Sequence, residues 1–205
     1  MAEVAEGTVA AEAKNIDVQN QLTKGSNPRG IPGAIFIEDV ENFVNDIDHP
    51  IETIIGAFNE LHRKYKFMES QQIQHKASYM QKVPEIERAI SLVKYLVENK
   101  ESEEDVIATY SLADTVYAKA KIEHQQGKVC LWLGANVMVE YTYDEALTLL
   151  EANLQKAKEK RATTTEDLEF LRNQVITVEV NMARVFNHNV KLRRLLAEAS
   201  GEERK

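Results

Sequence analysis

The chain is poor in residues that cross-link or interrupt a polypeptide. Its 205 residues include one cysteine, four prolines and eight glycines. The single cysteine, Cys130, excludes a disulfide within the chain and suits a reducing compartment, which predicts a cytoplasmic or nuclear location. Few prolines and glycines, together with 28% charged residues, favour long helices over a loop-rich sandwich.

Long apolar runs and an excess of positive charge are also missing. No run of about 18 apolar residues occurs, so we expect no membrane-spanning helix. Residues 1–30 have neither the basic nor the apolar region of a secretory signal, and their small, polar, aperiodic composition predicts a disordered tail. The formal net charge of −8 argues against nucleic acid as a partner, because phosphate binding needs clustered Lys and Arg.

Motifs that carry enzyme chemistry do not occur in the chain. The five histidines are scattered, without an HExxH motif or a Cys–His cluster, so we expect no metal site. Phosphate-binding loops, dinucleotide fingerprints and nucleophile elbows are missing too. Cys130 has only Lys128 as a basic neighbour, which favours an inert thiol. The sequence therefore predicts a protein that is not an enzyme and needs no cofactor.

Two long stretches do carry a strong pattern, with apolar residues three and four positions apart. They cover residues 51–96 and 147–196, and this spacing keeps one seam of each helix facing a partner helix. If the chain turns back between them, the helices run antiparallel. Setting Leu96 opposite Leu147 then brings the polar gaps of the two seams to the same height. Pro84 lies inside the first stretch and predicts a kink or short break there.

The apolar period changes from 3.5 to 2 between the two helices. Four short strands in two hairpins are expected, and we interpret "EHQQG" (123–127) as a hairpin loop. The third strand is apolar on both faces, as expected for a strand covered on both sides, and unpaired strand edges favour association. We therefore predict an oligomerisation surface; the alternative is a four-stranded cap packed on the ends of its own helices. The predicted oligomerisation residues are Val129, Leu131, Trp132, Leu133, Val137, Val139 and Tyr141.

Four segments of the sequence carry a resemblance to a known family. They are "KYKFME" (64–69), "KVCLWLGANVMVEYTYDEA" (128–146), "EDLEFLRNQ" (166–174) and "VEVNMARVFN" (178–187). With the order helix, two hairpins, helix, they resemble the α-type subunits of prefoldin over residues 30–194. The strand segment and "VNMARVFN" are specific, whereas heptads alone would be weak.

The resemblance implies an α+β fold, a long antiparallel two-helix coiled coil with two β-hairpins between the helices. The expected organisation along the chain follows from it. It is a disordered tail (1–30), an acidic entry segment with the first coiled-coil helix (31–103), two β-hairpins for oligomerisation (104–143), the second coiled-coil helix (144–198) and a C-terminal tail (199–205).

The resemblance also implies a function and partners. Prefoldin is a heterohexameric, ATP-independent chaperone (a holdase) that captures unfolded actin and tubulin at its coiled-coil tips and delivers them to the cytosolic chaperonin. The implied partners are β-type subunits, a second α-type subunit, these clients, the chaperonin and the von Hippel–Lindau protein. The rival hypothesis is a structural coiled-coil tether or scaffold that oligomerises through its β segment.

Client contact would fall to apolar seam residues at the free end of the coiled coil, where a frayed partner helix leaves them uncovered. Burying such side chains against an unfolded client yields about 25 cal/mol per Å². Each of them can equally be an ordinary seam residue. The candidates are Val44, Ile47, Ile51, Val185, Leu192, Leu195 and Leu196.

Overall fold

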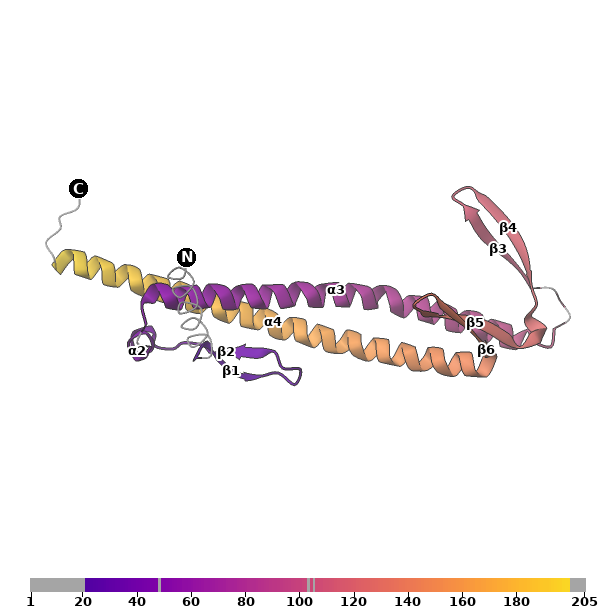
Figure 1. Ribbon diagram of the computed structural model, residues 1–205, viewed down its shortest axis with the longest axis horizontal. Helices are drawn as coiled ribbons and strands as arrows, with labels where there is room; N and C mark the ends of the chain where they lie inside the picture. The colour runs from indigo at the N-terminus through magenta and orange to yellow at the C-terminus, as the bar shows by residue number, and fades with distance from the viewer. Residues whose placement is uncertain (1–20, 48, 103, 105, 200–205) are drawn as a thin grey trace, which may run out of the picture. The chain divides into compact units, whose positions relative to one another are not determined.

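The fold was analysed in a computed structural model (Figure 1), which describes residues 21–47, 49–102, 104 and 106–199. The predicted order of a long helix, two hairpins and a second long helix is confirmed. The elements are β1 (Thr23–Ser26), β2 (Pro32–Ala34), α2 (Val40–Asp46), α3 (Ile51–Glu98), β3 (Val106–Ala113), β4 (Val116–Ile122), the 3-10 helix η1 (His124–Gln126), β5 (Lys128–Gly134), β6 (Val137–Thr142) and α4 (Tyr143–Ala199).

The chain forms two compact units, which are described separately. Unit 1 contains the described residues up to Gln74 and from Thr165 onward, and unit 2 is His75–Thr164. Both long helices contribute to both units. Unit 1 therefore holds the N-terminal elements with the first part of α3 and the last part of α4, and unit 2 holds the four strands β3–β6.

Helix α3 continues through Pro84 without interruption. Of the predicted kink or short break at this residue, the break is therefore wrong. A proline inside a helix costs about 3 kcal/mol through one lost hydrogen bond and a clash. Val83 and Ile90, on either side, are only 5% and 8% exposed, and burying each such side chain contributes about 1.5–3 kcal/mol. Burial of these neighbours thus offsets the cost of the proline.

Helix α4 begins directly after β6 with a capping box. The Thr142 N–H and hydroxyl both donate to Glu145 Oε2, at 3.1 and 2.8 Å, and the Glu145 N–H donates back to Thr142 Oγ1 at 3.4 Å. This exchange satisfies backbone donors that the first turn of a helix leaves free. The hydrogen bonds from Thr142 lower the pKa of the Glu145 carboxyl from its usual value.

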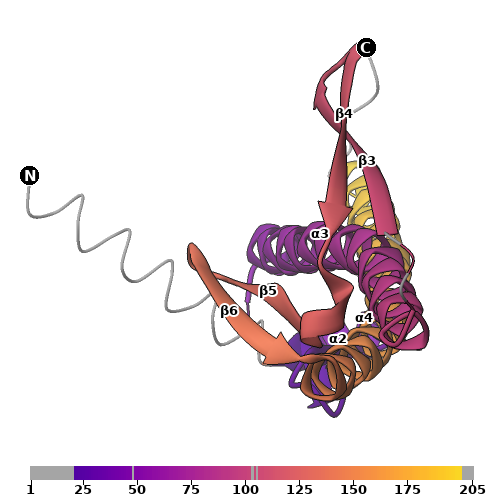
Figure 2. The ribbon, with the colours of Figure 1, turned by 90° about the vertical axis from the view of Figure 1, so that its right-hand side faces the viewer.

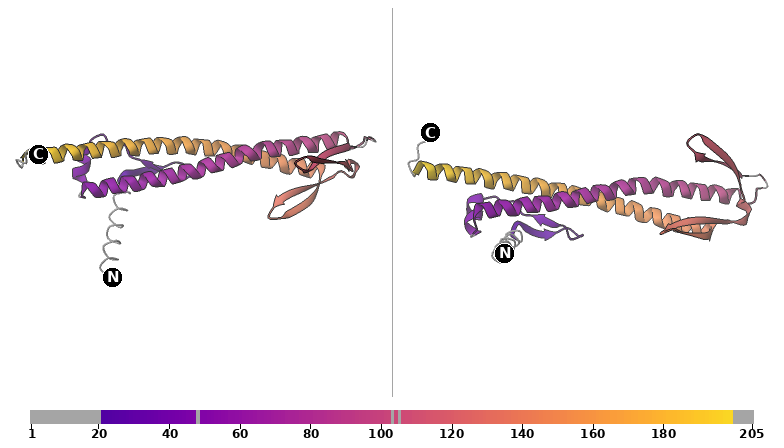
Figure 3. Two further views of the ribbon diagram at one scale, coloured as in Figure 1. Left: turned by 90° about the horizontal axis from the view of Figure 1, so that it is seen from above. Right: turned by 45° about the horizontal axis from the view of Figure 1, so that its top comes forward.

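The antiparallel helix pair follows the predicted register closely. Figure 3 shows α3 and α4 side by side in unit 1. Ion pairs across the two helices mark the alignment in each unit, although each exposed pair contributes little stability. These pairs are Glu52–Arg193 in unit 1, and Glu87–Lys158 and Lys94–Glu151 in unit 2. In unit 1 a hydrogen bond at 2.9 Å between His62 Nε2 and Glu179 Oε1 marks the same alignment.

The hydrophobic core of unit 1 is built from three parts of the chain. Helices α3 and α4 supply the seam, which includes Phe58 and Val178, both at most 1% exposed. The third part precedes α3: Leu22 is 2% and Ile31 7% exposed in the same core. The predicted disordered tail therefore does not extend to residue 30, because residues from Leu22 onward pack on the helices. Residues 1–20 lie outside the described part of the chain.

In unit 2 the four strands form two separate antiparallel pairs, β3 with β4 and β5 with β6 (Figure 2). The alternative of a four-stranded cap is therefore wrong.

The segment "EHQQG" is not a hairpin loop either, because it contains η1 and joins the two hairpins. His124 is buried there, with ring nitrogens 3.2 Å from the Ser102 carbonyl and 3.3 Å from that of Ile122. Tyr143 Oη donates to the His124 carbonyl at 2.7 Å, which fixes this connection to the start of α4.

Candidate functional site: strand surface and strap

The β5–β6 hairpin has one face packed on its own helices and one face exposed. Val129, Leu131 and Tyr141 pack against a small core formed by Val93, Tyr143 and Ala146, and Val139 is half-buried. These four predicted oligomerisation residues are therefore at least partly covered within the chain. Because isolated hairpins are marginal in water, this contact anchors the hairpin to the helix ends.

The other three predicted oligomerisation residues are exposed. Trp132, Leu133 and Val137 have 60%, 51% and 47% of their surface accessible. Regular alternation along β5 would place Leu133 on the same face as Leu131, but the pairing shifts between Trp132 and Gly134. Such an irregularity places one extra residue in the strand and re-aims its side chain. The exposed face of this hairpin is thus the face that another chain can cover.

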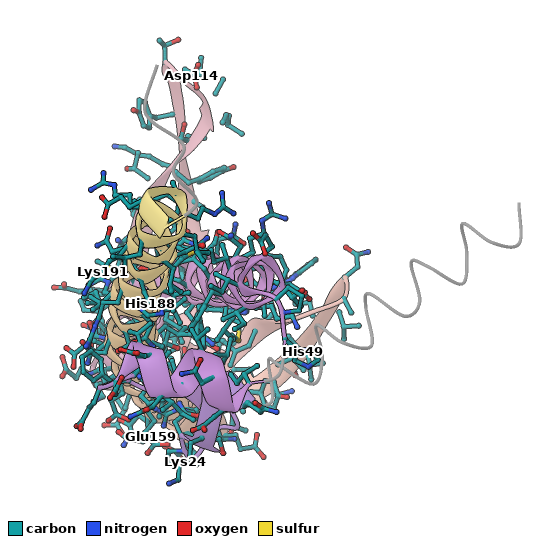
Figure 4. The ribbon with its side chains drawn as sticks, turned by 90° about the vertical axis from the view of Figure 1, so that its left-hand side faces the viewer. Lys24, His49, Asp114, Glu159, His188 and Lys191 are labelled. Atoms are coloured by element: carbon teal, nitrogen blue, oxygen red, sulfur yellow. The ribbon has the colours of Figure 1, made fainter. Side chains whose placement is uncertain are left out.

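The β3–β4 hairpin adds a second exposed apolar surface, which the predicted list of oligomerisation residues missed. Its period-2 alternation was visible in the sequence, but neither strand has two apolar faces. The exposed residues, each 49–65% accessible, are Ile107, Tyr110, Leu112, Val116 and Tyr117. They lie on the two strands that flank the turn at Asp114, which Figure 4 labels. Exposed apolar side chains gathered on one hairpin mark an association site in a folded protein.

A cavity of about 570 Å³ lies at the base of this hairpin, within unit 2. It is lined by the end of α3, including Leu92 and Tyr95, and by Val106 and Ile107 of β3. Leu92 and Tyr95 are themselves 65% and 50% exposed. The apolar surface of the hairpin therefore continues onto the helix.

The predicted client-binding residues separate into a buried and an exposed group. Ile47 and Val185 are 5% and 0% exposed, and Val44 and Ile51 are packed against the same core. The expectation that these four are uncovered seam residues is therefore wrong. Leu192 is half-buried. Only the last two of the predicted residues are well exposed, Leu195 at 52% and Leu196 at 66%.

Ile47 and Val185 are buried, and Val44 and Ile51 partly buried, because an N-terminal segment, residues 22–47, packs on α3 and α4. We call this segment the strap. Part of it is held by side chains of α4 that bind its main chain. Gln174 Oε1 accepts from the Ala34 N–H at 2.8 Å, and Asn181 bonds to both the Ile35 carbonyl and the Ile37 N–H, at 2.6 and 3.1 Å. These contacts supply partners for backbone groups that would otherwise be buried without one.

Arg184 and Tyr65 complete this set of main-chain contacts. Arg184 donates to the carbonyls of Ile37 and Glu38, at 2.7 and 2.8 Å, and its guanidinium carbon lies 5.3 Å from the centre of the Phe36 ring. Tyr65 Oη donates to the Pro32 carbonyl at 2.8 Å. Burial raises the pKa of Tyr65 to about 12. Its phenol therefore stays protonated and donating at neutral pH.

A polar latch fastens the strap near its start. Arg29 Nε donates to Asp167 Oδ1 at 2.5 Å, Asn27 Nδ2 donates to the same oxygen at 2.8 Å, and Arg29 Nη2 donates to Glu166 at 3.2 Å. Asp167 is 5% exposed, so its carboxylate needs these partners. Asn27 also shapes the turn, because its Oδ1 accepts from the Arg29 and Ile31 N–H groups.

The strap contacts are not evident from the sequence. Their helix residues lie in the conspicuous segments "KYKFME", "EDLEFLRNQ" and "VEVNMARVFN", which indicated their importance but not their partners. Within the part of the chain that the structure describes, no group of three or more His, Cys, Asp and Glu side chains could hold a metal ion. The described helices also include none with the length and hydropathy needed to cross a membrane.

Comparison with known proteins gives consistent matches. The family model described as "Prefoldin subunit" matches residues 65–188. Prefoldin subunit 3 from Homo sapiens is 42% identical over 187 residues, covering 89% of this chain and 94% of the relative. Probable prefoldin subunit 3 from Schizosaccharomyces pombe is 46% identical over 169 residues, covering 82% of this chain and 96% of the relative.

Among solved structures, the chain is similar to filamentous PFD from Methanocaldococcus jannaschii, determined by cryo-EM. The identity is 19%, the TM-score is 0.46, and the match covers 60% of this chain and 98% of the other. The family assignment depends instead on the extent and identity of the matches to the curated relatives. By these matches, the chain belongs to the prefoldin subunit family.

Proposed function

We propose that this chain is an α-type subunit of a heterohexameric prefoldin and acts there as an ATP-independent holdase. Family membership makes it a subunit of a chaperone complex. The observation that carries the finer proposal is the exposed apolar surface on both hairpins, which includes Trp132 at 60% and Leu112 at 63% exposure. Water disfavours such surface by about 25 cal/mol per Å², so neighbouring β-type subunits and a second α-type subunit are expected to cover it.

Client capture is proposed to use weak, repeated contacts. Leu195 and Leu196 near the end of α4 are exposed apolar residues that can meet the exposed side chains of unfolded actin or tubulin. Each contact is small, but several subunits held in one complex bind together through their high effective concentration. Transfer to the cytosolic chaperonin and contact with the von Hippel–Lindau protein belong to the same proposal, as does action in the cytoplasm or nucleus.

Two measurements test the proposal. Sedimentation of the chain with β-type prefoldin subunits is expected to show a discrete complex near six chains. That complex is then expected to suppress aggregation of denatured actin without ATP. A two-chain or open-ended assembly would favour the rival tether or scaffold. A discrete complex that leaves actin aggregation unchanged would overturn the holdase function.

A further inference from the structure

We propose that the helix surface beneath the strap is a binding site for extended, unfolded polypeptide, and that the strap occupies it as an intramolecular ligand. The surface is formed by Tyr65 of α3 and by Gln174, Asn181 and Arg184 of α4. This inference rests on the proposed holdase function and adds a defined client site to it. Every contact used lies within unit 1.

The recognition is directed at the main chain. Six hydrogen bonds, two of them donated by the strap's own N–H groups, link these four side chains to the backbone of Pro32, Ala34, Ile35, Ile37 and Glu38. Main-chain contacts of this kind give affinity for an extended peptide without demanding a particular sequence. Apart from proline, which lacks an N–H, any residue of an unfolded client offers the same donors and acceptors.

Side-chain amides suit this role well. An amide carries both a donor and an acceptor, and Asn181 uses one of each on the two residues that flank Phe36. Gln174, Asn181 and Arg184 are seven and three positions apart, a spacing that places them on one face of α4. The three side chains thus follow the path of a chain lying along the helix.

The side chains of the strap define the chemistry of a fitting client. Ile31 and Ile37 are buried at 7% and 4%, whereas Phe36 is 52% exposed and Glu38 is also exposed. Around Ile37 the buried and exposed residues alternate, as in an extended chain. The site therefore suits segments with an apolar residue at alternate positions, a pattern that folded proteins hide in their strands and unfolded proteins expose.

The latch lies outside this recognition site and can be loosened separately. Arg29 binds Asp167 and Glu166, and its side chain is 34% exposed. Removing Arg29 takes away both ion pairs and leaves the buried Asp167 carboxylate with Asn27 as a partner, which weakens the latch. Removing Arg29 leaves Tyr65, Gln174, Asn181 and Arg184 intact, so the strap can leave more often while the site keeps its shape.

The first test uses the assembled complex and a fluorescein-labelled peptide, IPGAIFIE, which copies residues 31–38. Arg29→Ala is expected to tighten peptide binding at least about five-fold over the unmodified complex, because a larger fraction of sites is then free. Adding Asn181→Leu is expected to abolish that gain, whereas Asn187→Leu, an exposed position on the same helix, is expected to keep it. Equal binding by all complexes would overturn the inference.

A second test keeps the strap folded and closed. In a Cys130→Ser background, Arg29→Cys and Glu166→Cys are joined by a short bismaleimide, which is expected to eliminate peptide binding; each single-cysteine variant treated in the same way is expected to retain it. Peptide binding that survives the crosslink would refute occupancy by the strap.

Failure of the unmodified complex to protect denatured actin would instead count against the holdase function. Protection of actin with no effect of latch or crosslink on the peptide would overturn only the strap site.

Discussion

The Ile37 N–H donates to Asn181 Oδ1 at 3.1 Å, although the two residues are 144 positions apart in the chain. Both residues are buried, at 4% and 1% exposure. The contact joins the strap to α4 across 144 of the chain's 205 residues. In unit 1 the helix pair is therefore not a bare coiled coil, because a third chain segment shares its core.

Asn181→Leu is expected to lower the free energy of unfolding by about 2 kcal/mol. The substitution keeps a side chain of similar size but leaves the Ile37 N–H and the Ile35 carbonyl without their partner, and an unsatisfied buried group costs about 1–3 kcal/mol. Urea denaturation followed by circular dichroism measures the change. Asn187→Leu, at an exposed position, is the matched control and should change stability by less than about 0.5 kcal/mol. Equal effects of the two variants would show that the strap contact contributes nothing.

Leu22→Ala is expected to destabilise the protein by about 2–4 kcal/mol, the usual cost of truncating a fully buried leucine. Leu22 is 2% exposed in the unit 1 core, although composition alone placed it in a disordered tail. The exposed Ser26→Ala, four residues further along in β1, is the control. Unchanged denaturation of Leu22→Ala would restore the original interpretation of this segment as a tail.

Trp132→Asp is expected to weaken assembly with β-type subunits at least about 30-fold, because a charge buried without a partner costs several kcal/mol. The helical signal of the isolated chain should stay unchanged, since Trp132 is 60% exposed there. Sedimentation and far-ultraviolet circular dichroism measure the two quantities. Asn153→Asp, which adds the same charge at an exposed position of α4, should assemble normally. Normal assembly by Trp132→Asp would place this residue outside the subunit interface.

Alkaline pH is expected to destabilise the protein through Tyr65. Its pKa is about 12 in the folded chain and about 10 when unfolded. The unfolded state therefore loses the proton first, so the stabilisation is complete below pH 10 and is lost as the pH rises from 10 to 12. Tyr65→Phe is expected to unfold with a weaker pH dependence in that window, measured as the urea midpoint at pH 8 and pH 11. Parallel pH profiles for the two proteins would contradict the assignment.

Local periodicity made most of the fold predictable. Apolar residues that recur every 3.5 or every 2 positions indicate which face of a helix or strand is buried, without information from the rest of the chain. The heptads of α3 and α4 and the alternation in β3 to β6 are of this kind. Pro84 does not break α3, because the burial of Val83 and Ile90 on either side offsets its local effect on the helix.

The strap could not be predicted in this way. Leu22 and Ile31 follow neither period. Ile37 shares the three- and four-residue spacing, but its hydrogen-bond partner Asn181 lies 144 positions away. Asn181 and Arg184 stood within a specific sequence segment, but a main-chain partner leaves no side-chain pattern to search for. The wrong expectation for Val185 and Ile47 has the same cause. Both residues fit the seam pattern, and the sequence carries no signal of the distant segments that bury them.

The direct junction of β6 and α4 has a mechanical consequence. Strand β6 ends at Thr142 and α4 begins at the next residue, Tyr143, so no linker lies between them. The capping box between Thr142 and Glu145 stabilises this junction. Because each helical residue turns the chain by about 100°, inserting one alanine at this joint would rotate the Leu147 side chain away from its neighbours or twist the hairpin out of place. The direct connection therefore fixes the rotation of α4 about its own axis relative to the β5–β6 hairpin.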